Sequence, residues 1–435
     1  MRYKSTSSDD NIVYRKAVWV YLFLLIFEGA LRKWFLPALS TPLLMARLPV
    51  VVWLWVIGAQ KGWLRNGYAS AMMITATVSL IMTLIVGHQN MNTALYGWSI
   101  YFFYFPFIFI MGNVLTREDL LKIGRFILYL SIPMTVLIAI QFYSPQSAWV
   151  NRGVGGAMEG VGFSGALDYF RPPGTFSFIS GYINFQMLVG CYLFYYLLAN
   201  KSLKQEQQIR PQHLWIMLGC YLISIPYSIS RTHFYQTLVI MLFVLAIGIL
   251  VRRYNKRIIN MFVVGAMAIT VIFALNIQGD SINAFTARFE GASETEGGVV
   301  KGTIGNRFIG AYGRAFNDDL PLFGYGIGLG TNIGTKLVGA NSIYDKFNGE
   351  EEWSRIAGEC GLLLGLIIII VRCLFPLTIF SKSYKLLKEK QDLLPWLLCV
   401  SLLLFIPQGQ FGNSTGLGFA VFAGGLVFSA VKTSS

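Results

Sequence analysis

Long apolar stretches recur along the whole chain, and they constrain its fold more than any other feature of the sequence. A helix needs about 20 consecutive apolar residues to cross the hydrocarbon core of a bilayer. Stretches of roughly that length occur about twelve times, over residues 17–31, 42–60, 68–87, 94–115, 121–142, 176–198, 213–229, 233–251, 258–276, 356–379, 393–407 and 415–431. Because lipid offers the backbone no hydrogen-bond partners, such stretches fold as helices and not as open sheet. The sequence therefore predicts an all-α polytopic membrane protein.

The composition excludes the main soluble classes of protein. Charged residues make up 13% of the 435 residues and hydrophobic residues 55%, whereas soluble domains carry about 25% charged residues. The net charge of +14 would suggest nucleic-acid binding in a soluble protein. In a membrane protein we expect the excess of Lys and Arg to mark one side of the bilayer, and we expect no nucleic-acid partner.

The cysteines and histidines do not form a recognisable metal or cofactor site. All five cysteines fall inside apolar stretches, where a small core residue is expected, and the three histidines lie in separate segments. Metal sites in proteins need several such ligands at short, defined spacings. We therefore expect no metal and no cofactor.

The distribution of basic residues predicts the orientation of the chain. With the N-terminus placed in the cytoplasm, the inner connections carry more Lys and Arg than the outer ones, and the short outer connection 87–93 carries none. The positive-inside rule then places both termini in the cytoplasm. The expected organisation is a region of about nine helices over 1–276 with an outer loop at 143–175, a large, partly helical outer loop at 277–355, and about three helices over 356–435.

Two arginines stand at predicted helix starts on the outer side. Arg171 precedes two prolines, which are compatible with the first turn of a helix, so we expect Arg171 beside a helix N-terminus that attracts anions, as a substrate-binding residue. The alternatives are an arginine that extends to the membrane interface or a pair with Asp168. Arg231 lies in a polar turn between two apolar stretches, where Ser230 or Thr232 is suited to cap the next helix. A charge at that depth is costly unless it is paired or needed, so we interpret Arg231 as catalytic. His233 and Tyr235 follow as substrate-binding candidates, with a structural role as the alternative for His233.

The large outer loop contributes a second pair of arginines. Arg307 and Arg314 lie two turns apart in a helix-like stretch, which places both on one face. We interpret Arg307 as catalytic and Arg314 as substrate-binding, with ordinary loop charges as the alternative. The glycine-rich run 324–330 lacks the strand and the lysine of a nucleotide-binding loop. We interpret it as turns that let the backbone approach a substrate or a neighbouring helix.

Three carboxylates stand directly before an apolar stretch, and we interpret them as candidate catalytic bases. Glu350, Glu351 and Glu352 fall at a predicted helix N-terminus, where the alternative is that they only stabilise the helix dipole. Arg355 and Glu359 follow as substrate-binding candidates. The spacing predicts ion pairs of Arg355 with Glu352 and with Glu359. Glu359 lies one turn inside the membrane and needs such a partner.

Several arginines at the outer membrane surface suit a membrane-anchored anion, because guanidinium groups bind phosphate oxygens in bidentate fashion. A polyprenyl diphosphate that carries a sugar is such an anion. If an acceptor hydroxyl attacks the anomeric carbon, the diphosphate leaves, and arginines can stabilise its developing charge without a metal. A carboxylate or histidine near the acceptor would take up the proton.

The order of these motifs resembles that of the O-antigen polymerase and O-antigen ligase superfamily. The matching stretches are 171–176, 230–231, Arg307 with 321–328, and 355–365. The resemblance implies a metal-independent, inverting glycosyltransferase in the bacterial inner membrane with its active site facing the periplasm. It implies that Arg231 and Arg307 contact the diphosphate. The implied partners are undecaprenyl-diphosphate-linked oligosaccharide as donor and acceptor, the lipid bilayer, a chain-length regulator and a flippase.

One departure from the family pattern bears on the reaction. The ligases carry a His-Asn-like pair shortly before the Glu-x-Gly sequence, and Glu350 and Glu351 stand there in this chain. This favours a polymerase of O-antigen or exopolysaccharide repeat units over a ligase that transfers glycan to lipid A core, which remains the alternative. A transporter or flippase is the alternative from another class. Transporters usually carry charged residues near mid-membrane. Here Arg47 and Arg372 are isolated within spans, and the outer face holds the charged clusters.

Overall fold

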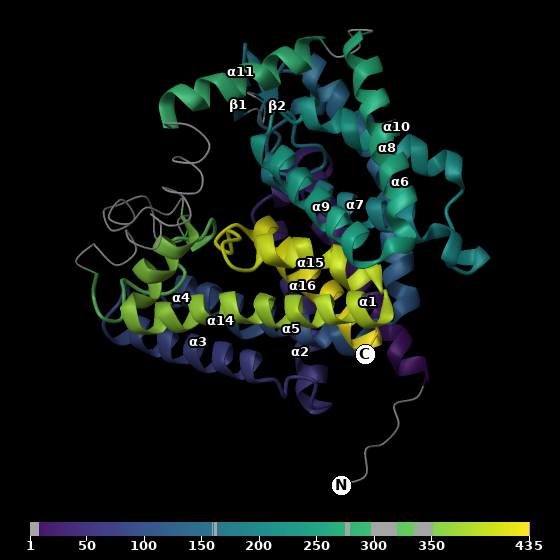
Figure 1. Cartoon of the computed structure of the whole chain (residues 1–435). Coiled ribbons are helices and arrows are strands. Elements are labelled where there is room, and N and C mark those ends of the chain that lie inside the picture. The colour runs from purple at the N-terminus through teal and green to yellow at the C-terminus, as the bar shows by residue number, and fades with distance from the viewer. Residues whose placement is uncertain are drawn as a thin grey trace.

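The computed structural model describes residues 8–158, 160, 163–274, 279–296, 320–334, 337 and 351–434, which form a bundle of helices with one small hairpin (Figure 1). The helices are α1 (Ser8–Ala30), α2 (Leu48–Gln60), α3 (Gly67–Ile85), α4 (Met91–Ser99), α5 (Phe105–Val114), α6 (Arg117–Tyr143), α7 (Ile179–Ala199), α8 (Pro211–Tyr227), α9 (Arg231–Leu250), α10 (Asn255–Ala274), α11 (Gly279–Glu296), α14 (Glu352–Lys390), α15 (Leu393–Phe405) and α16 (Ser414–Ser434). Short π- or 3₁₀-helical segments lie at Leu31–Phe35, Pro37–Leu39, Pro42–Met45, Ile100–Tyr104, Trp149–Asn151, Asn200–Ser202, Gln205–Gln207 and Arg252–Tyr254. The hairpin consists of β1 (Phe163–Ala166) and β2 (Tyr169–Arg171).

The helical class predicted from the sequence is confirmed. Each apolar stretch named above overlaps a helix. Within the described residues, eight helices are long and apolar enough to cross a membrane, and α15 is a shorter apolar helix. The chain is therefore an all-α protein with the helices of a multi-pass membrane protein.

The centre of the bundle is formed by α5, α7, α15 and α16, which are buried on almost all sides. Glycines let α5 and α16 approach closely, since Gly112 lies against the Phe428 ring and Gly425 lies against Met111. Small residues at such contacts are typical of helix packing in membranes, where close van der Waals contact replaces the hydrophobic effect. The outward sides of other helices carry exposed apolar side chains such as Ile74 and Leu242.

Polar contacts tie the helix ends together at two opposite faces of the bundle. At one face, which we call the pocket face, Lys33 after α1 donates hydrogen bonds to the carbonyls of Gly174 and Phe176 before α7, at 2.7 and 2.8 Å. At the opposite face, Arg117 at the start of α6 pairs with Asp392 before α15 at 2.8 Å. These contacts fix the connection before α7 at the pocket face and the start of α6 at the opposite face.

The surroundings of Arg171 differ from the sequence-based expectation. Arg171 ends strand β2, which pairs with β1 in antiparallel fashion, and α7 begins only at Ile179. The prediction that Arg171 flanks a helix N-terminus was therefore wrong. The physical reason is that a proline disfavours helical conformation in the residue before it, which here extends the backbone at Arg171. The tight turn at Leu167 and Asp168 uses positive φ angles of 51° and 62°, which suit a hairpin.

The glycine-rich run packs against helices, as the sequence predicted. The Tyr325 amide donates to the Gly358 carbonyl of α14 at 2.8 Å, and the Ile327 amide donates to the Thr83 hydroxyl of α3 at 2.9 Å. Within α14, Gly361 breaks the helical conformation with φ 73° and ψ −178°, a region that is essentially restricted to glycine. Its missing side chain leaves room for the Leu322 carbonyl and the Gly324 amide.

Candidate functional site

A group of arginines on three separate segments meets at the pocket face. Arg171 comes from strand β2 and Arg231 from the first position of α9. Burial lowers the pKa of the Arg171 guanidinium, and the positive charges of Arg288 and Arg231 lower it further. Like charges affect each other's pKa in this way only at short range. We call Arg171, Arg231 and Arg288 the arginine cluster.

Helix α11 brings Arg288 to the cluster through aromatic packing. Phe289 lies next to Arg288 and packs edge-on against Phe234 and Tyr235 of α9, with ring centroids 5.7 and 6.0 Å apart. Phe285, one turn earlier, packs against Phe234 at 6.1 Å. Helix α11 lies across the end of the bundle beside β1 and α8 (Figure 1). Sequence reasoning missed Arg288, although Phe285 and Phe289 at helical spacing were a signal that this segment docks as a helix.

An aromatic and an acid lie close to the arginine cluster. Tyr169 in strand β2 stacks on Phe142 at the end of α6, with centroids 4.5 Å apart and an interplanar angle of 5°. Burial and the neighbouring Asp280 carboxylate of α11 raise the pKa of the Tyr169 phenol. The cluster is thus flanked by an aromatic stack and by one carboxylate.

At the start of α9, Arg231 and Thr232 are at least partly exposed, whereas His233 is buried. Ser230 occupies the N-cap position, but its side chain makes no capping hydrogen bond, unlike the expectation. His233 is fully buried between the rings of Tyr182 and Tyr221, with centroids 6.4 and 5.6 Å away. Neither ring nitrogen of His233 has a hydrogen-bond partner within the described part of the chain. His233 therefore lies inside the bundle, two residues after Arg231 of the cluster.

Three of the residues singled out in the sequence lie outside the described residues. They are Arg307, Arg314 and Glu350. Their assigned roles stay predictions.

Glu352, the first residue of α14, belongs to a buried ionic network. Arg355 pairs with Glu352 at 2.8 Å and with Glu359 at 2.7 Å, which confirms the two ion pairs predicted from the spacing. Arg372, which follows Glu352 by 20 residues in α14, also pairs with Glu352. Arg372 is therefore not the isolated charge expected from the sequence, because the fold places a carboxylate beside it. All four side chains are at most 2% exposed, and we call them the α14 network.

The α14 network fixes the surrounding loops. The Glu359 carboxylate accepts a hydrogen bond from the Gly330 amide at 2.7 Å, and Arg372 donates to the carbonyls of Ile406 and Gly409 at 2.7 and 2.6 Å. Glu352 accepts from both guanidinium groups, which favours a structural role over that of a proton acceptor. Glu351 is the N-cap of α14 and stays partly exposed.

A second buried network lies at the ends of α1 and α16. The Glu28 carboxylate pairs with Arg47 at 3.1 Å and with Arg32 at 3.4 Å. Arg47 also donates to the Ser414 hydroxyl at 2.6 Å. Arg47 was expected to be isolated as well, and the expectation was wrong for the same reason: a partner 19 residues away in the chain folds next to it.

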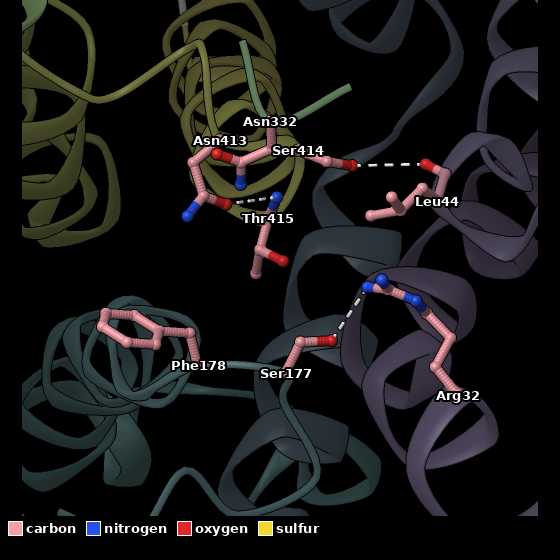
Figure 2. A pocket seen from close by; sticks show the side chains of 8 residues that line it. All are labelled: Arg32, Leu44, Ser177, Phe178, Asn332, Asn413, Ser414 and Thr415. Atoms are coloured by element: carbon pink, nitrogen blue, oxygen red, sulfur yellow. Dashed lines mark hydrogen bonds between the residues drawn. The ribbon is translucent and has the colours of Figure 1, made fainter. Parts of the chain in front are cut away.

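A polar pocket opens between these two networks (Figure 2). Its volume is about 510 Å³, within the range of roughly 300–1,000 Å³ typical of small-molecule sites. It is lined by Arg32, Leu44, Ser177, Phe178, Asn332, Asn413, Ser414 and Thr415. In Figure 2, Asn332, Asn413 and Thr415 stand on one side of the opening, and Arg32, Ser177 and Phe178 stand on the other.

Hydrogen bonds hold the walls of this pocket in place. The side-chain oxygen Oδ1 of Asn413 accepts from the Thr415 backbone amide at 2.9 Å. The Asn332 amide donates to the Gly412 carbonyl at 3.0 Å, and Arg32 donates to the Ser177 hydroxyl at 3.0 Å. Sequence reasoning did not single out any of these polar residues, because they come from four distant segments and form no local motif.

The described residues contain no group of three or more His, Cys, Asp or Glu side chains placed to hold a metal ion. The pocket face instead offers guanidinium, amide and hydroxyl groups. Such groups bind anions and sugar hydroxyls directly.

No protein-family model matches the chain, and no curated protein matches its sequence.

Proposed function

We propose that the protein is a polymerase of lipid-diphosphate-linked oligosaccharide repeat units, such as O-antigen or exopolysaccharide, in the bacterial inner membrane. The observation that carries this proposal is the arginine cluster. Arg171, Arg231 and Arg288 come from three segments, and the charges of Arg231 and Arg288 both lower the pKa of Arg171. Bringing like charges together costs free energy, and a diphosphate ligand would offset that cost.

The proposed arrangement has about twelve membrane spans and cytoplasmic termini. The pocket face then lies in the periplasm. Two features support this orientation: basic connections concentrate at the opposite face, and α11 packs against β1 and α8 at the pocket face. A lipid-linked substrate would reach the cluster from the outer leaflet, with its prenyl chain against the apolar sides of the helices.

The proposed reaction is an inverting transfer. An acceptor hydroxyl attacks the anomeric carbon of the donor, and the bond between that carbon and the diphosphate oxygen breaks. Arg231 and Arg307 stabilise the departing diphosphate, with Arg171 and Arg288 beside them. Among the carboxylates proposed from the sequence, Glu350 and Glu351 remain the candidates for accepting the hydroxyl proton.

The polar pocket is the proposed place for the sugar units next to the reacting bond. Amide groups such as those of Asn332 and Asn413 can donate and accept at once, which suits neighbouring hydroxyl groups of a sugar. Phe178, which is 37% exposed, offers an apolar face. The walls are held by buried ion pairs, so the pocket would be largely preformed.

The direct test supplies the purified protein with an undecaprenyl-diphosphate-linked oligosaccharide and follows the products by gel electrophoresis and mass spectrometry. A ladder of longer glycans on the same lipid carrier supports the polymerase. Transfer only to a lipid A core acceptor would replace it by the ligase. Movement of intact lipid-linked glycan across a vesicle membrane, without any new glycosidic bond, would replace it by the transporter.

Substitutions of the two proposed diphosphate contacts, Arg231 and Arg307, test the site assignment. We expect Arg231→Ala and Arg307→Ala each to abolish chain extension while the protein still inserts into the membrane. Arg210→Ala is the matched control, because this exposed arginine precedes α8 at the opposite face. Normal polymerisation by both the Arg231 and the Arg307 variants would show that the site assignment is wrong.

A further inference from the structure

The two buried networks beside the polar pocket differ in net charge. The α14 network joins two arginines to two glutamates, so its charges balance. The network at the ends of α1 and α16 joins two arginines, Arg32 and Arg47, to the single carboxylate of Glu28. We call these three residues the α1 network, and it carries one positive charge in excess. A buried charge without a counter-charge costs free energy, which a ligand of opposite charge would offset.

Arg32 is the member of the α1 network that lines the pocket, and it is 5% exposed. Its Nε donates to the Ser40 carbonyl at 2.6 Å, and its Nη1 donates to the Ser177 hydroxyl and to Glu28. Its Nη2 has no hydrogen-bond partner among the residues that the structure describes. In Figure 2 the guanidinium points toward the space between Ser177 and Thr415. Arg32 therefore presents a fixed charge with N–H groups left for a ligand.

The Glu28 carboxylate compensates Arg32 only in part. Glu28 lies closer to Arg47, at 3.1 Å, than to Arg32, at 3.4 Å. Burial lowers the pKa of the Arg32 guanidinium, and the attraction of Glu28 does not restore it, since Arg47 repels the same group. The excess charge of the α1 network is thus located next to the pocket.

Two further polar side chains of the pocket are left as hydrogen-bond donors. Oδ1 of Asn413 accepts from the backbone amides of Thr415 and Gly416, at 2.9 and 3.3 Å. These contacts orient the side-chain amide, so its Nδ2 is the part that remains for a ligand. The Ser177 oxygen accepts from Arg32, which leaves the hydroxyl proton to be donated. The pocket therefore combines excess positive charge with donors on both of its walls.

A carboxylate is the group that fits this combination. It accepts about four hydrogen bonds and donates none, and a guanidinium binds it through charge-assisted hydrogen bonds. Its single negative charge equals the excess of the α1 network, whereas a diphosphate carries more. A neutral sugar has hydroxyl protons that need acceptors, and it would leave the charge of Arg32 uncompensated.

We propose that the polar pocket binds an acidic sugar, such as a hexuronate, with its carboxylate on Arg32 and Ser177. Nδ2 of Asn413 donates to an oxygen of the same sugar from the other wall. This inference rests on the proposed function and names its substrate class, which is repeat units that contain a carboxylated sugar. Arg32 then selects the substrate and takes no part in bond breaking.

The test measures binding of a soluble tetrasaccharide to the purified full-length protein in neutral detergent by isothermal titration calorimetry. One probe alternates glucuronate and glucose, and the other is its carboxyl-reduced form, in which every glucuronate is glucose. We expect wild type to bind the acidic probe about tenfold more tightly. Arg32→Gln should remove this preference, and Ser177→Ala should lower it about threefold. Arg210→Gln is the matched control, because it removes the same charge from an exposed position at the opposite face and should keep the preference.

Thermal unfolding in the same detergent verifies that the variants are folded. If Arg32→Gln does not fold, Ser177→Ala decides, because it removes one donor and breaks no ion pair. Equal binding of the two probes by wild type, or an unchanged preference in the folded pocket variants, would overturn the proposal. So would an equal loss in the Arg210 control. Displacement of the acidic probe by inorganic diphosphate at equal concentration would assign the pocket to the diphosphate instead.

A second experiment separates this inference from the proposed function. The protein is supplied with lipid-diphosphate-linked repeat units that carry either glucuronate or its carboxyl-reduced form. Extension of both at the same rate would overturn the acidic-sugar assignment and leave the polymerase. Preferential binding of the acidic tetrasaccharide, without extension of either lipid-linked substrate, would refute the polymerase and keep the pocket assignment.

Discussion

At the scale of single residues, the bundle distinguishes neighbouring carboxylates that look equivalent in the sequence. Glu352 is buried and accepts hydrogen bonds from Arg355 and Arg372, whereas Glu351 occupies the N-cap position of α14 and is partly exposed. Buried ions need partners, and the removal of one partner leaves the others uncompensated. The two positions should therefore respond differently to the same substitution.

The first prediction compares Glu352→Gln with Glu351→Gln. We expect Glu352→Gln to lower the free energy of unfolding by about 3 kcal/mol, because two buried guanidinium groups lose their shared carboxylate. Glu351→Gln should change it by no more than about 0.5 kcal/mol. Unfolding by denaturing detergent, followed by tryptophan fluorescence, measures both. Equal stability of the two variants would contradict the structural role of Glu352.

The second prediction concerns Arg288, which only the structure brought to the arginine cluster. Arg288→Gln removes one of the charges that lower the pKa of Arg171. We expect the variant to be at least as stable as wild type, since a repulsion is relieved, and to bind a prenyl diphosphate about tenfold more weakly. Binding is measured by displacement of a fluorescent prenyl diphosphate. Lys256→Gln, exposed at the start of α10, is the control for net charge. Unchanged affinity in the Arg288 variant would remove Arg288 from the site.

At the scale of elements, one irregular residue in α14 determines how the loop before it packs. Gly361 interrupts the helix where the backbone of Leu322 and Gly324 comes closest. The loop then donates the Gly326 and Gly330 amides to the backbone and side chain of Glu359. A regular helix at this point would fill the space that the loop occupies.

The third prediction compares two glycine substitutions. Gly361→Ala should lower the free energy of unfolding by about 2–4 kcal/mol, because the side chain would meet the Leu322 carbonyl and the backbone conformation excludes alanine. Gly219→Ala in α8 meets no atom within 4 Å. That variant should be neutral or up to about 1 kcal/mol more stable, as expected for alanine within a helix. The measurement is again unfolding in mixed micelles, and a neutral Gly361 variant would refute the packing argument.

At the scale of the whole molecule, the two faces carry different chemistry. The pocket face combines the arginine cluster with a pocket of amide and hydroxyl groups. The opposite face carries a cavity whose lining includes Arg117, Arg253 and Lys390, and we call it the basic cavity. An excess of basic residues on one side is what the positive-inside rule expects of the cytoplasmic side.

The fourth prediction tests the orientation of the molecule. A cysteine introduced by Thr415→Cys should react with a membrane-impermeant maleimide in spheroplasts, whereas one introduced by Ser202→Cys should react only after lysis. Thr415 lines the polar pocket and Ser202 lines the basic cavity, so the pair reports on both faces. Both cysteines are introduced into a protein in which the partly exposed Cys220 and Cys373 have been replaced, so that native cysteines do not contribute to the labelling. The reverse labelling pattern would show that the orientation in the membrane is opposite to the proposed one.

Only part of the site was accessible from the sequence. The pairs of Arg355 with Glu352 and Glu359 were predictable because three or four residues span one helical turn. The pairs of Arg47 with Glu28 and of Arg372 with Glu352 were not, since they join different turns or different helices. Arg171 was placed wrongly because two prolines are also compatible with an extended strand end.

The sequence by itself determined that this chain forms helices in a membrane, because long apolar stretches leave the backbone no other way to satisfy its hydrogen bonds in lipid. Local spacing along a helix also determined the α14 pairs. Only the tertiary structure decided that Arg288 joins Arg171 and Arg231, and that Asn332 and Asn413 share a pocket with Arg32. The physical reason is that these contacts depend on how distant helices pack, and packing depends on shape and close contact between surfaces that no local pattern of residues records.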